Sequence, residues 1–340
     1  MRIGIRNCFI VVLLISLTAF SGYAQTSQSE LDQVQKDVEE FSNSLAKALP
    51  FNSTLGLNWS DAYIGRIFPS VPPHFGIGFS VGATSMEASS IKNLANNLGA
   101  DISGDLGRMP IPSYTVEARV GGFILPFDLG FKFGFLPVIN ISDIKINFML
   151  AGGDIRYAIL DGSRNLILPN VSLGIGLNYL SGGIGTSVGS SQRISFFIGN
   201  NAYNFVLEQP KANFKWDTIS LDLKAQVSKS FFFITPYLGL GGAYAWSKAG
   251  YEVEADITLN NGPVRPQDIV AINNELERMG YNRIDVSETG ISSIIDHNDF
   301  NFRLFGGLSF NMMVMRLDIT GLYSFLDNNF GASLGLRFQL

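Results

Sequence analysis

The chain has 340 residues, of which 46% are hydrophobic and only 16% charged, and its formal net charge at pH 7 is −5. This composition is apolar for a soluble protein, and the negative charge argues against a nucleic-acid partner, which selects a basic surface. The single cysteine, Cys8, lies in an N-terminal segment that we expect to be removed, so disulfide and thiol chemistry are excluded for the rest of the chain.

The first 24 residues have the three parts of a secretory signal peptide. Arg2 and Arg6 form a basic start, an unbroken apolar run covers residues 8–20, and the small-x-small pattern at residues 22–24 is typical of a cleavage site. The apolar run is shorter than the ~20 residues of a spanning helix, which disfavours a transmembrane anchor. We therefore predict export with cleavage after Ala24.

A helix is predicted between Ser27 and Pro50. Ser27 and Glu30 match a capping box, and Pro50 is expected to end the helix. Apolar residues spaced three and four apart form one face of this helix. The face would contact the barrel interior if the helix plugs the lumen, or else a partner. This face consists of Leu31, Val34, Val38, Phe41 and Leu45.

From residue 74 onward, apolar residues alternate with small or polar ones, which is the period of a β-strand. Ten strands of about 9 to 13 residues are expected, long enough to cross a bilayer at a tilt. In the fourth strand the alternation changes parity at residues 151–153, which predicts a β-bulge. The expected strands cover residues 75–84, 114–121, 129–135, 144–159, 171–179, 219–227, 234–246, 300–310, 313–325 and 330–340.

Long connections, expected to be extracellular, cover residues 85–113, 180–214 and 247–299 and alternate with short ones. A transmembrane barrel shows this alternation because its two ends face different compartments. The even strand number would place both chain termini on the periplasmic side. Helices are expected at residues 89–98 and 266–279, and a hairpin around residues 199–201. If that hairpin entered the wall, the barrel would have twelve strands, and twelve to fourteen strands are the alternative to ten.

Aromatic residues gather near both ends of the expected strands, as in the two interfacial belts of a membrane barrel. Near the long connections these are Tyr114, Tyr179, Trp216, Tyr244, Trp246, Phe302, Tyr323 and Phe330, and near the short ones Phe123, Phe127, Tyr157, Phe231, Phe310 and Phe338.

The polar face of the strands is rich in glycine and carries charges of both signs, which suits a crowded barrel interior. The residues expected to face this lumen are Glu117, Arg119, Lys132, Lys145, Asp222, Lys224, Arg303, Arg316, Asp318 and Arg337. They could form a packed network of cross-strand ion pairs or line a narrow aqueous pathway and bias its ion selectivity. We favour the network, and conduction through gaps in it is kept as an alternative.

The end of the chain resembles the C-terminal β-signal of bacterial outer-membrane barrels. The matching residues are Ser333, Gly335, Phe338 and Leu340, although that family favours a final phenylalanine. The resemblance implies assembly by the barrel-assembly machinery. An N-terminal segment followed by a barrel is also similar in plan to the long-chain fatty-acid transporters, whose fourteen strands and asparagine-proline-alanine element have no match here.

Catalytic and metal sites are not expected. The two histidines are His74 and His297, and the latter stands in Asp296-His297-Asn298-Asp299, where an Asp/His pair could activate water. No nucleophile motif can be placed opposite this pair, and one histidine among acids does not define a metal site. We predict a protein without enzymatic activity, cofactor or metal.

The sequence therefore predicts an all-β transmembrane antiparallel up-and-down barrel in the bacterial outer membrane, with an N-terminal amphipathic helix. The first functional hypothesis is a narrow channel or transporter for small solutes. The alternatives are a surface-exposed ligand-binding or adhesion protein anchored by a closed barrel, fatty-acid-transporter-like uptake of hydrophobic molecules, and a soluble exported β-protein. Residues 25–73 would plug the lumen, cap its periplasmic mouth or bind a periplasmic partner. Outer-membrane lipid is an expected partner.

Overall fold

The computed structural model describes residues 28–62, 74–87, 107–121, 126–141, 144–162, 167–187, 192–198, 201–207, 211–254, 257–259, 262–263 and 290–339, together with residues 64, 89, 270 and 274. The expected signal peptide lies outside these residues, as do the expected loop helices except for residues 89, 270 and 274. Ten strands close into an antiparallel barrel in the order β1-β14-β13-β12-β9-β8-β5-β4-β3-β2, which confirms the predicted fold class. Within the described residues, no helix is long and apolar enough to cross a membrane.

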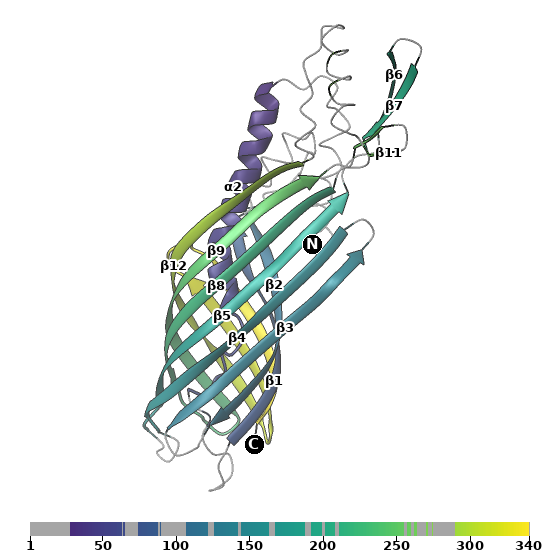
Figure 1. Ribbon diagram of the computed structural model, residues 1–340. Helices are drawn as coiled ribbons and strands as arrows, with labels where there is room; N and C mark the ends of the chain where they lie inside the picture. The colour runs from purple at the N-terminus through teal and green to yellow at the C-terminus, as the bar shows by residue number, and fades with distance from the viewer. Residues whose placement is uncertain are drawn as a thin grey trace, which may run out of the picture.

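The wall is an up-and-down barrel in which each strand pairs with the wall strands before and after it (Figure 1). Its strands are β1 (His74–Glu87), β2 (Arg108–Gly121), β3 (Phe127–Ile141), β4 (Ile144–Leu160), β5 (Asn170–Ser187), β8 (Lys211–Ser228), β9 (Ile234–Glu254), β12 (Gly290–Met312), β13 (Met315–Ser324) and β14 (Phe330–Gln339). A helix, α2 (Gln28–Ser53), precedes them.

The predicted hairpin in the long connection at residues 180–214 is confirmed, but it does not enter the wall. Its strands are β6 (Gln192–Ile198) and β7 (Asn201–Leu207), which join β10 (Ile257–Leu259) and β11 (Gly262–Pro263) in a separate four-stranded sheet. The barrel therefore has ten strands, and the wider estimate of twelve to fourteen is wrong.

The two ends of the barrel differ. The long-loop end carries the connections at residues 88–107, 188–210 and 255–289, and the short-turn end carries those at residues 122–126, 161–169, 229–233 and 313–314. Strands reach further toward the long-loop end than alternation predicted: β9 has 21 residues and β12 has 23. The expected loops are shortened accordingly.

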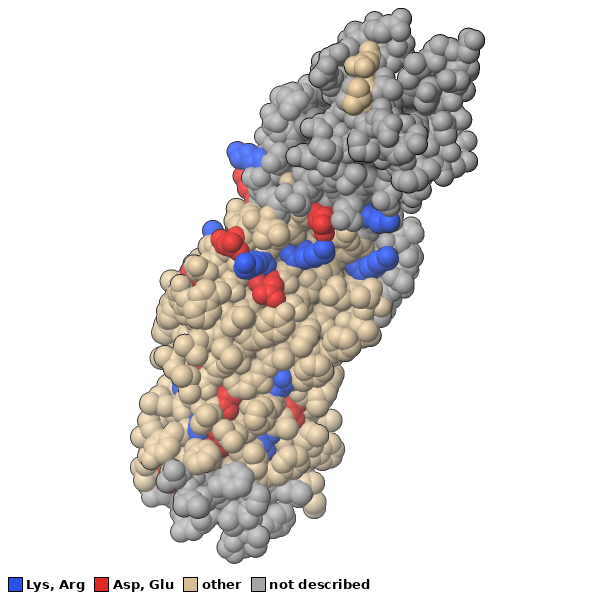
Figure 2. All heavy atoms as spheres, viewed as in Figure 1, with Lys and Arg blue, Asp and Glu red and all other residues tan. Residues whose placement is uncertain are grey.

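The outer face of the wall is apolar. Exposed apolar residues alternate with buried ones along the wall strands, as in β13, where Leu317 and Ile319 point outward and Arg316 and Asp318 inward. In Figure 2 the charged side chains form a band near the long-loop end, and the wall below that band is mostly uncharged. A closed barrel with an apolar outer band leaves no unpaired edge in lipid. The protein is thus a β-barrel of the bacterial outer-membrane type.

Most of the expected aromatic belt faces outward. Tyr244, Trp246, Tyr323 and Phe330 are exposed near the long-loop end, and Tyr157 near the short-turn end. Trp216 is an exception, because it packs inward against a buried apolar cluster. Its position in the belt was wrongly predicted.

Closure of the barrel depends on the last strand. β14 pairs with β1 from Gly76↔Gln339 to Thr84↔Gly331, and its other edge pairs with β13. We expect deletion of residues 338–340 to prevent assembly, because it removes pairs from both edges of the closing strand. The loss of heat-modifiable gel mobility in outer-membrane fractions would report this. Normal assembly would contradict a closing role for these residues.

Candidate functional site: the filled barrel lumen

A single stretch of chain, residues 41–62 and 64, runs through the barrel interior; we call it the lumen segment. Near the long-loop end, Leu45 and Leu49 belong to a buried cluster with wall residues Met86, Leu150, Leu180 and Ala249. Further along, Phe51 and Leu55 pack with Tyr237, Phe305 and Leu322. At the short-turn end, the amide of Ile64 donates to Asp128 Oδ2 at 3.0 Å. The segment therefore spans the lumen from the long-loop end to the short-turn end.

The helix enters from the end opposite to the one predicted. Figure 1 shows α2 projecting from the long-loop end, and its ring contact between Phe41 and Phe214 lies at that end. β1 begins at the short-turn end after the lumen segment has crossed the barrel. The helix also continues one turn past Pro50 to Ser53. The interpretation that both termini share the short-turn side therefore holds for the end of β14 and is wrong for the start of α2.

The lumen near the long-loop end is apolar. One of the strands that make it so is β4, whose first half faces the opposite way to the prediction. β4 pairs with β3 without a register shift from Phe127↔Tyr157 to Leu136↔Phe148, so the predicted bulge at residues 151–153 is absent from this pairing. Leu150 consequently points inward and is fully buried, whereas Lys145 is exposed on the outer face. The prediction that Lys145 faces the lumen is wrong, since the inward apolar residues of β4 cover the helix.

In the middle of the lumen, wall side chains bind the main chain of the segment. Lys132 Nζ donates to the carbonyls of Ser53 at 2.7 Å and Leu55 at 2.6 Å. Gly56 has a φ of 81°, and a Cβ there would lie 2.8 Å from Thr115 Oγ1. Only glycine tolerates both this conformation and this close approach.

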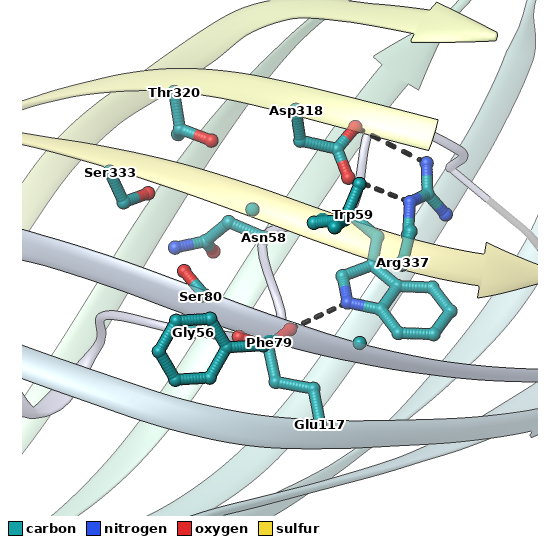
Figure 3. A pocket seen from close by; sticks show the side chains of 13 residues that line it. Gly56, Asn58, Trp59, Phe79, Ser80, Glu117, Asp318, Thr320, Ser333 and Arg337 are labelled. Atoms are coloured by element: carbon teal, nitrogen blue, oxygen red, sulfur yellow. Dashed lines mark hydrogen bonds and ion pairs between the residues drawn. The ribbon is translucent and has the colours of Figure 1, made fainter. Parts of the chain in front are cut away.

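Trp59 occupies the lumen beside a small cavity (Figure 3). Its indole Nε1 donates to Glu117 Oε2 at 2.6 Å, and the guanidinium of Arg337 lies 4.7 Å from a ring centroid of the indole. A Cβ at Gly76 would come within 2.6 Å of this ring, so the glycine makes room for it. The cavity has a volume of about 20 Å³, which is room for about one water molecule.

Asp61 joins two wall arginines near the short-turn end. Its carboxylate lies 2.6 Å from Arg316 Nη1 and 2.9 Å from Arg337 Nη1, and Arg337 Nε also contacts Asp318 at 2.7 Å. Asp61 is buried, and its two arginine partners supply the opposite charge that such burial requires. Asp61 therefore links the lumen segment to β13 and β14.

A second network lies beside it and is fully buried. Asp128 contacts Arg119 at 2.5 Å and Arg156 at 2.8 Å, and Asp154 contacts Arg119 at 2.7 Å and also Lys224. Arg156 Nη1 donates to the Asp61 carbonyl at 2.7 Å, which ties the network to the lumen segment. Isolated charges in such surroundings would cost several kcal/mol each, so their mutual pairing is what makes their burial tolerable.

Apart from Lys145, the residues predicted to face the lumen are all buried in the barrel interior. Arg303 and Asp222 form a bidentate pair with both distances 2.8 Å. The residues that alternation missed are Asp128, Asp154 and Arg156 on the wall and Trp59 and Asp61 on the lumen segment. Asp154 and Arg156 would have been found from the even-numbered inward parity of β4, and Asp128 from the same parity of β3. Nothing in the local pattern marks Asp61.

The remaining predicted residues are placed as follows. Ser333 is buried on the inner face and Phe338 is exposed on the outer one, while Leu340 lies outside the described residues. On α2, Phe41 packs at the edge of the apolar cluster and Leu45 is buried in it. The side chains of Leu31, Val34 and Val38 lie outside what the structure describes.

Residues 296–299, which are predicted to lie in the long connection at residues 247–299, lie within β12. His297 Nε2 is 3.2 Å from Asp299 Oδ2, and Asp296 pairs with Lys248 at 3.5 Å. In the part of the chain that the structure describes, no three histidine, cysteine or acidic side chains gather as a metal site.

Comparison with solved structures returns barrels at low similarity. The N-terminal β-barrel domain of Pseudomonas aeruginosa OprF is 9% identical with a TM-score of 0.25, covering 78% of this chain and 97% of its own. The translocator domain of the autotransporter NalP from Neisseria meningitidis is 7% identical with a TM-score of 0.29, covering 90% and 97%. The outer membrane protease OmpT from Escherichia coli is 10% identical with a TM-score of 0.35, covering 80% and 99%.

No curated protein sequence matches the chain. The model of the Lsa36-like family matches residues 23–340, which is nearly the whole sequence. The chain therefore belongs to the Lsa36-like family.

Proposed function

We propose that this protein is a closed outer-membrane barrel, exported by its signal peptide, that anchors ligand-binding or adhesive elements at the cell surface. The observation that carries this proposal is the lumen segment, which crosses the whole barrel interior. The surface elements would be the long-loop end, including the sheet of β6, β7, β10 and β11 and the first half of α2. The proposed role is not catalytic and uses no nucleic-acid partner or cofactor.

The bonding of the lumen segment supports a permanently closed barrel. Wall cations donate to its main-chain carbonyls: Lys132 to Ser53 and Leu55, and Arg156 to Asp61. Gln226 Nε2 adds bonds to the carbonyls of Trp59 at 2.8 Å and Ser60 at 3.1 Å. If the segment left, water would have to replace these bonds, and each intramolecular hydrogen bond lost would cost about 0.5–1.5 kcal/mol.

A narrow channel for small solutes is the second candidate. The observation that favours it is the charged inner wall, which would line a water-filled pathway once the lumen segment moved. The buried wall cations are Arg119, Lys132, Arg156, Lys224, Arg303, Arg316 and Arg337, and the buried wall anions are Glu117, Asp128, Asp154, Asp222 and Asp318. In this form of the proposal, solute passage requires displacement of the segment.

Uptake of hydrophobic molecules has less support from the geometry. The apolar part of the lumen is occupied by Leu45 and Leu49 of the protein itself, and both side chains are packed against wall residues. An apolar ligand would have to replace the helix there.

The display of α2 can be tested with single cysteines, because the chain has no cysteine after the expected signal peptide. We expect a membrane-impermeant maleimide to label Lys36→Cys and Lys248→Cys on intact cells, since both side chains are exposed at the long-loop end. Ser230→Cys, in a short turn, should react only after the outer membrane is permeabilised.

Each alternative gives a different pattern in this assay. Labelling of Ser230→Cys without the other two would show that the barrel is inserted the other way round. Labelling of Lys248→Cys but not Lys36→Cys would retain the surface anchor and contradict the display of α2. Matched reactivity of all three variants in denaturant provides the control for intrinsic thiol reactivity.

A further inference from the structure

Three turns at the short-turn end present large apolar side chains to the surroundings. Ile167 is 88% exposed, Phe232 102% and Met313 92%, and their neighbours Leu168, Phe231, Phe233 and Met312 are also exposed. We call these seven residues the apolar turn rim. Short turns of a soluble face would carry polar residues, and a contiguous apolar patch on a folded protein marks a contact surface.

The three turns are neighbours in the structure. Lys229 Nζ, in the β8–β9 turn, donates to the carbonyl of Leu168 at 2.7 Å in the β4–β5 turn. On the other side, the Asn311 amide donates to the carbonyl of Phe233 at 2.7 Å, which joins the β8–β9 turn to the β12–β13 turn. The apolar turn rim is therefore one continuous arc along the barrel end.

The backbone at two tips of this arc is unfavourable for the residues it carries. Phe232 and Met313 have φ values of 46° and 53°, in the left-handed region. Both stand in two-residue hairpin turns, closed by Phe231↔Ile234 and Met312↔Met315. Such positions favour glycine, asparagine or aspartate, and bulky side chains there are uncommon. Local turn preference thus gives no reason for phenylalanine and methionine, whose large apolar side chains point to a contact made outside the chain.

The arc continues the face that already contacts lipid. Leu238 follows the β8–β9 turn on the outer face of β9, and Leu308 and Leu317 flank the β12–β13 turn on the outer faces of their strands, all exposed. The turn sequences Lys-Ser-Phe-Phe-Phe at 229–233 and Asn-Met-Met-Val at 311–314 contain no acidic residue, whereas the β4–β5 turn contains Asp161. The tips at Phe232 and Met313 are therefore apolar and free of negative charge, which suits the boundary between phosphate headgroups and acyl chains.

We propose that the apolar turn rim inserts into the bilayer leaflet at the short-turn end, with Phe232 and Met313 reaching the acyl chains. The partner is phospholipid, and the proposal rests on the membrane barrel alone, so it is independent of any surface function. Insertion fixes the height of the barrel in the membrane on this side.

The depth of the tips can be measured with an environment-sensitive fluorophore such as NBD on single cysteines. In phosphatidylcholine vesicles, Phe232→Cys and Met313→Cys conjugates should emit at shorter wavelength and be quenched several-fold more by acyl-brominated lipid than Ser230→Cys, the matched control in the same turn. Water-like emission and no quenching at both tips, in barrels that retain heat-modifiable mobility, would overturn the proposal.

A second measurement separates lipid insertion from turn preference, because the two predict opposite changes in the urea midpoint of unfolding. Turn preference alone predicts that Phe232→Gly with Met313→Asn raises the urea midpoint of unfolding from vesicles. Our proposal predicts a lower midpoint, because two apolar anchors are lost, and a near-wild-type midpoint for Phe232→Leu. A higher midpoint for the double variant would contradict insertion.

Discussion

Asp61→Arg is expected to convert a silent barrel into a conducting one in planar lipid bilayers. In the native protein, the Asp61 carboxylate holds Arg316 and Arg337 at 2.6 and 2.9 Å. A third guanidinium in this buried position would replace two attractions by two repulsions. Losing one partner of a buried ion pair costs about 3–5 kcal/mol, which is roughly a thousandfold change in the closed-to-open ratio. The short-turn half of the lumen segment should therefore leave, exposing the charged wall to water.

The wild-type protein sets the baseline for this experiment and should show no steady conductance. Lys47→Glu is the matched charge change on α2, because Lys47 is exposed, and it should stay silent.

Two results would contradict this account. Steady conductance of the wild-type protein at neutral pH would show that the lumen segment does not close the barrel, and would favour the channel hypothesis. A silent Asp61→Arg variant with native heat-modifiable mobility would show that Asp61 does not hold the segment in place.

Asp128→Asn is expected to lower the free energy of unfolding by roughly 3–5 kcal/mol. The Asp128 carboxylate is fully buried and accepts from Arg119 at 2.5 Å, from Arg156 at 2.8 and 2.9 Å, and from the Ile64 amide at 3.0 Å. Asparagine keeps the size but removes the charge, so two buried guanidinium groups lose a counter-ion. Urea unfolding in vesicles, followed by tryptophan fluorescence, measures the difference.

Lys215→Gln is the control for removing a charge from an ion pair. Lys215 lies 2.5 Å from Glu252, but its side chain is 70% exposed, and exposed pairs contribute about 0–1 kcal/mol. We expect its unfolding midpoint to be close to that of the wild type. Equal effects of the two substitutions would mean that the Asp128 network is hydrated and contributes no more than a surface pair.

Much of the wall could be predicted because its signals are local. Period-two alternation placed all ten strands, and the inward charges on β2, β8, β13 and β14 followed from the same parity. The pattern failed on β4, where Ile146, Phe148 and Leu150 are as apolar as a lipid-facing row. These residues face the barrel interior, where Leu150 and Phe148 pack in the cluster that contains Leu45 and Leu49 of α2. The alternation along a strand is the same whether its apolar residues meet lipid or a buried helix.

The sequence by itself determined that this chain forms a closed, lipid-facing barrel, because alternation along each strand is a property of neighbouring residues. Only the tertiary structure decided what fills the barrel and from which end. Asp61 and Arg337 are 276 positions apart, and no local pattern links a loop carboxylate to a guanidinium on the last strand. Their pairing arises only when the wall closes around the segment, since burial then requires each charge to find a partner.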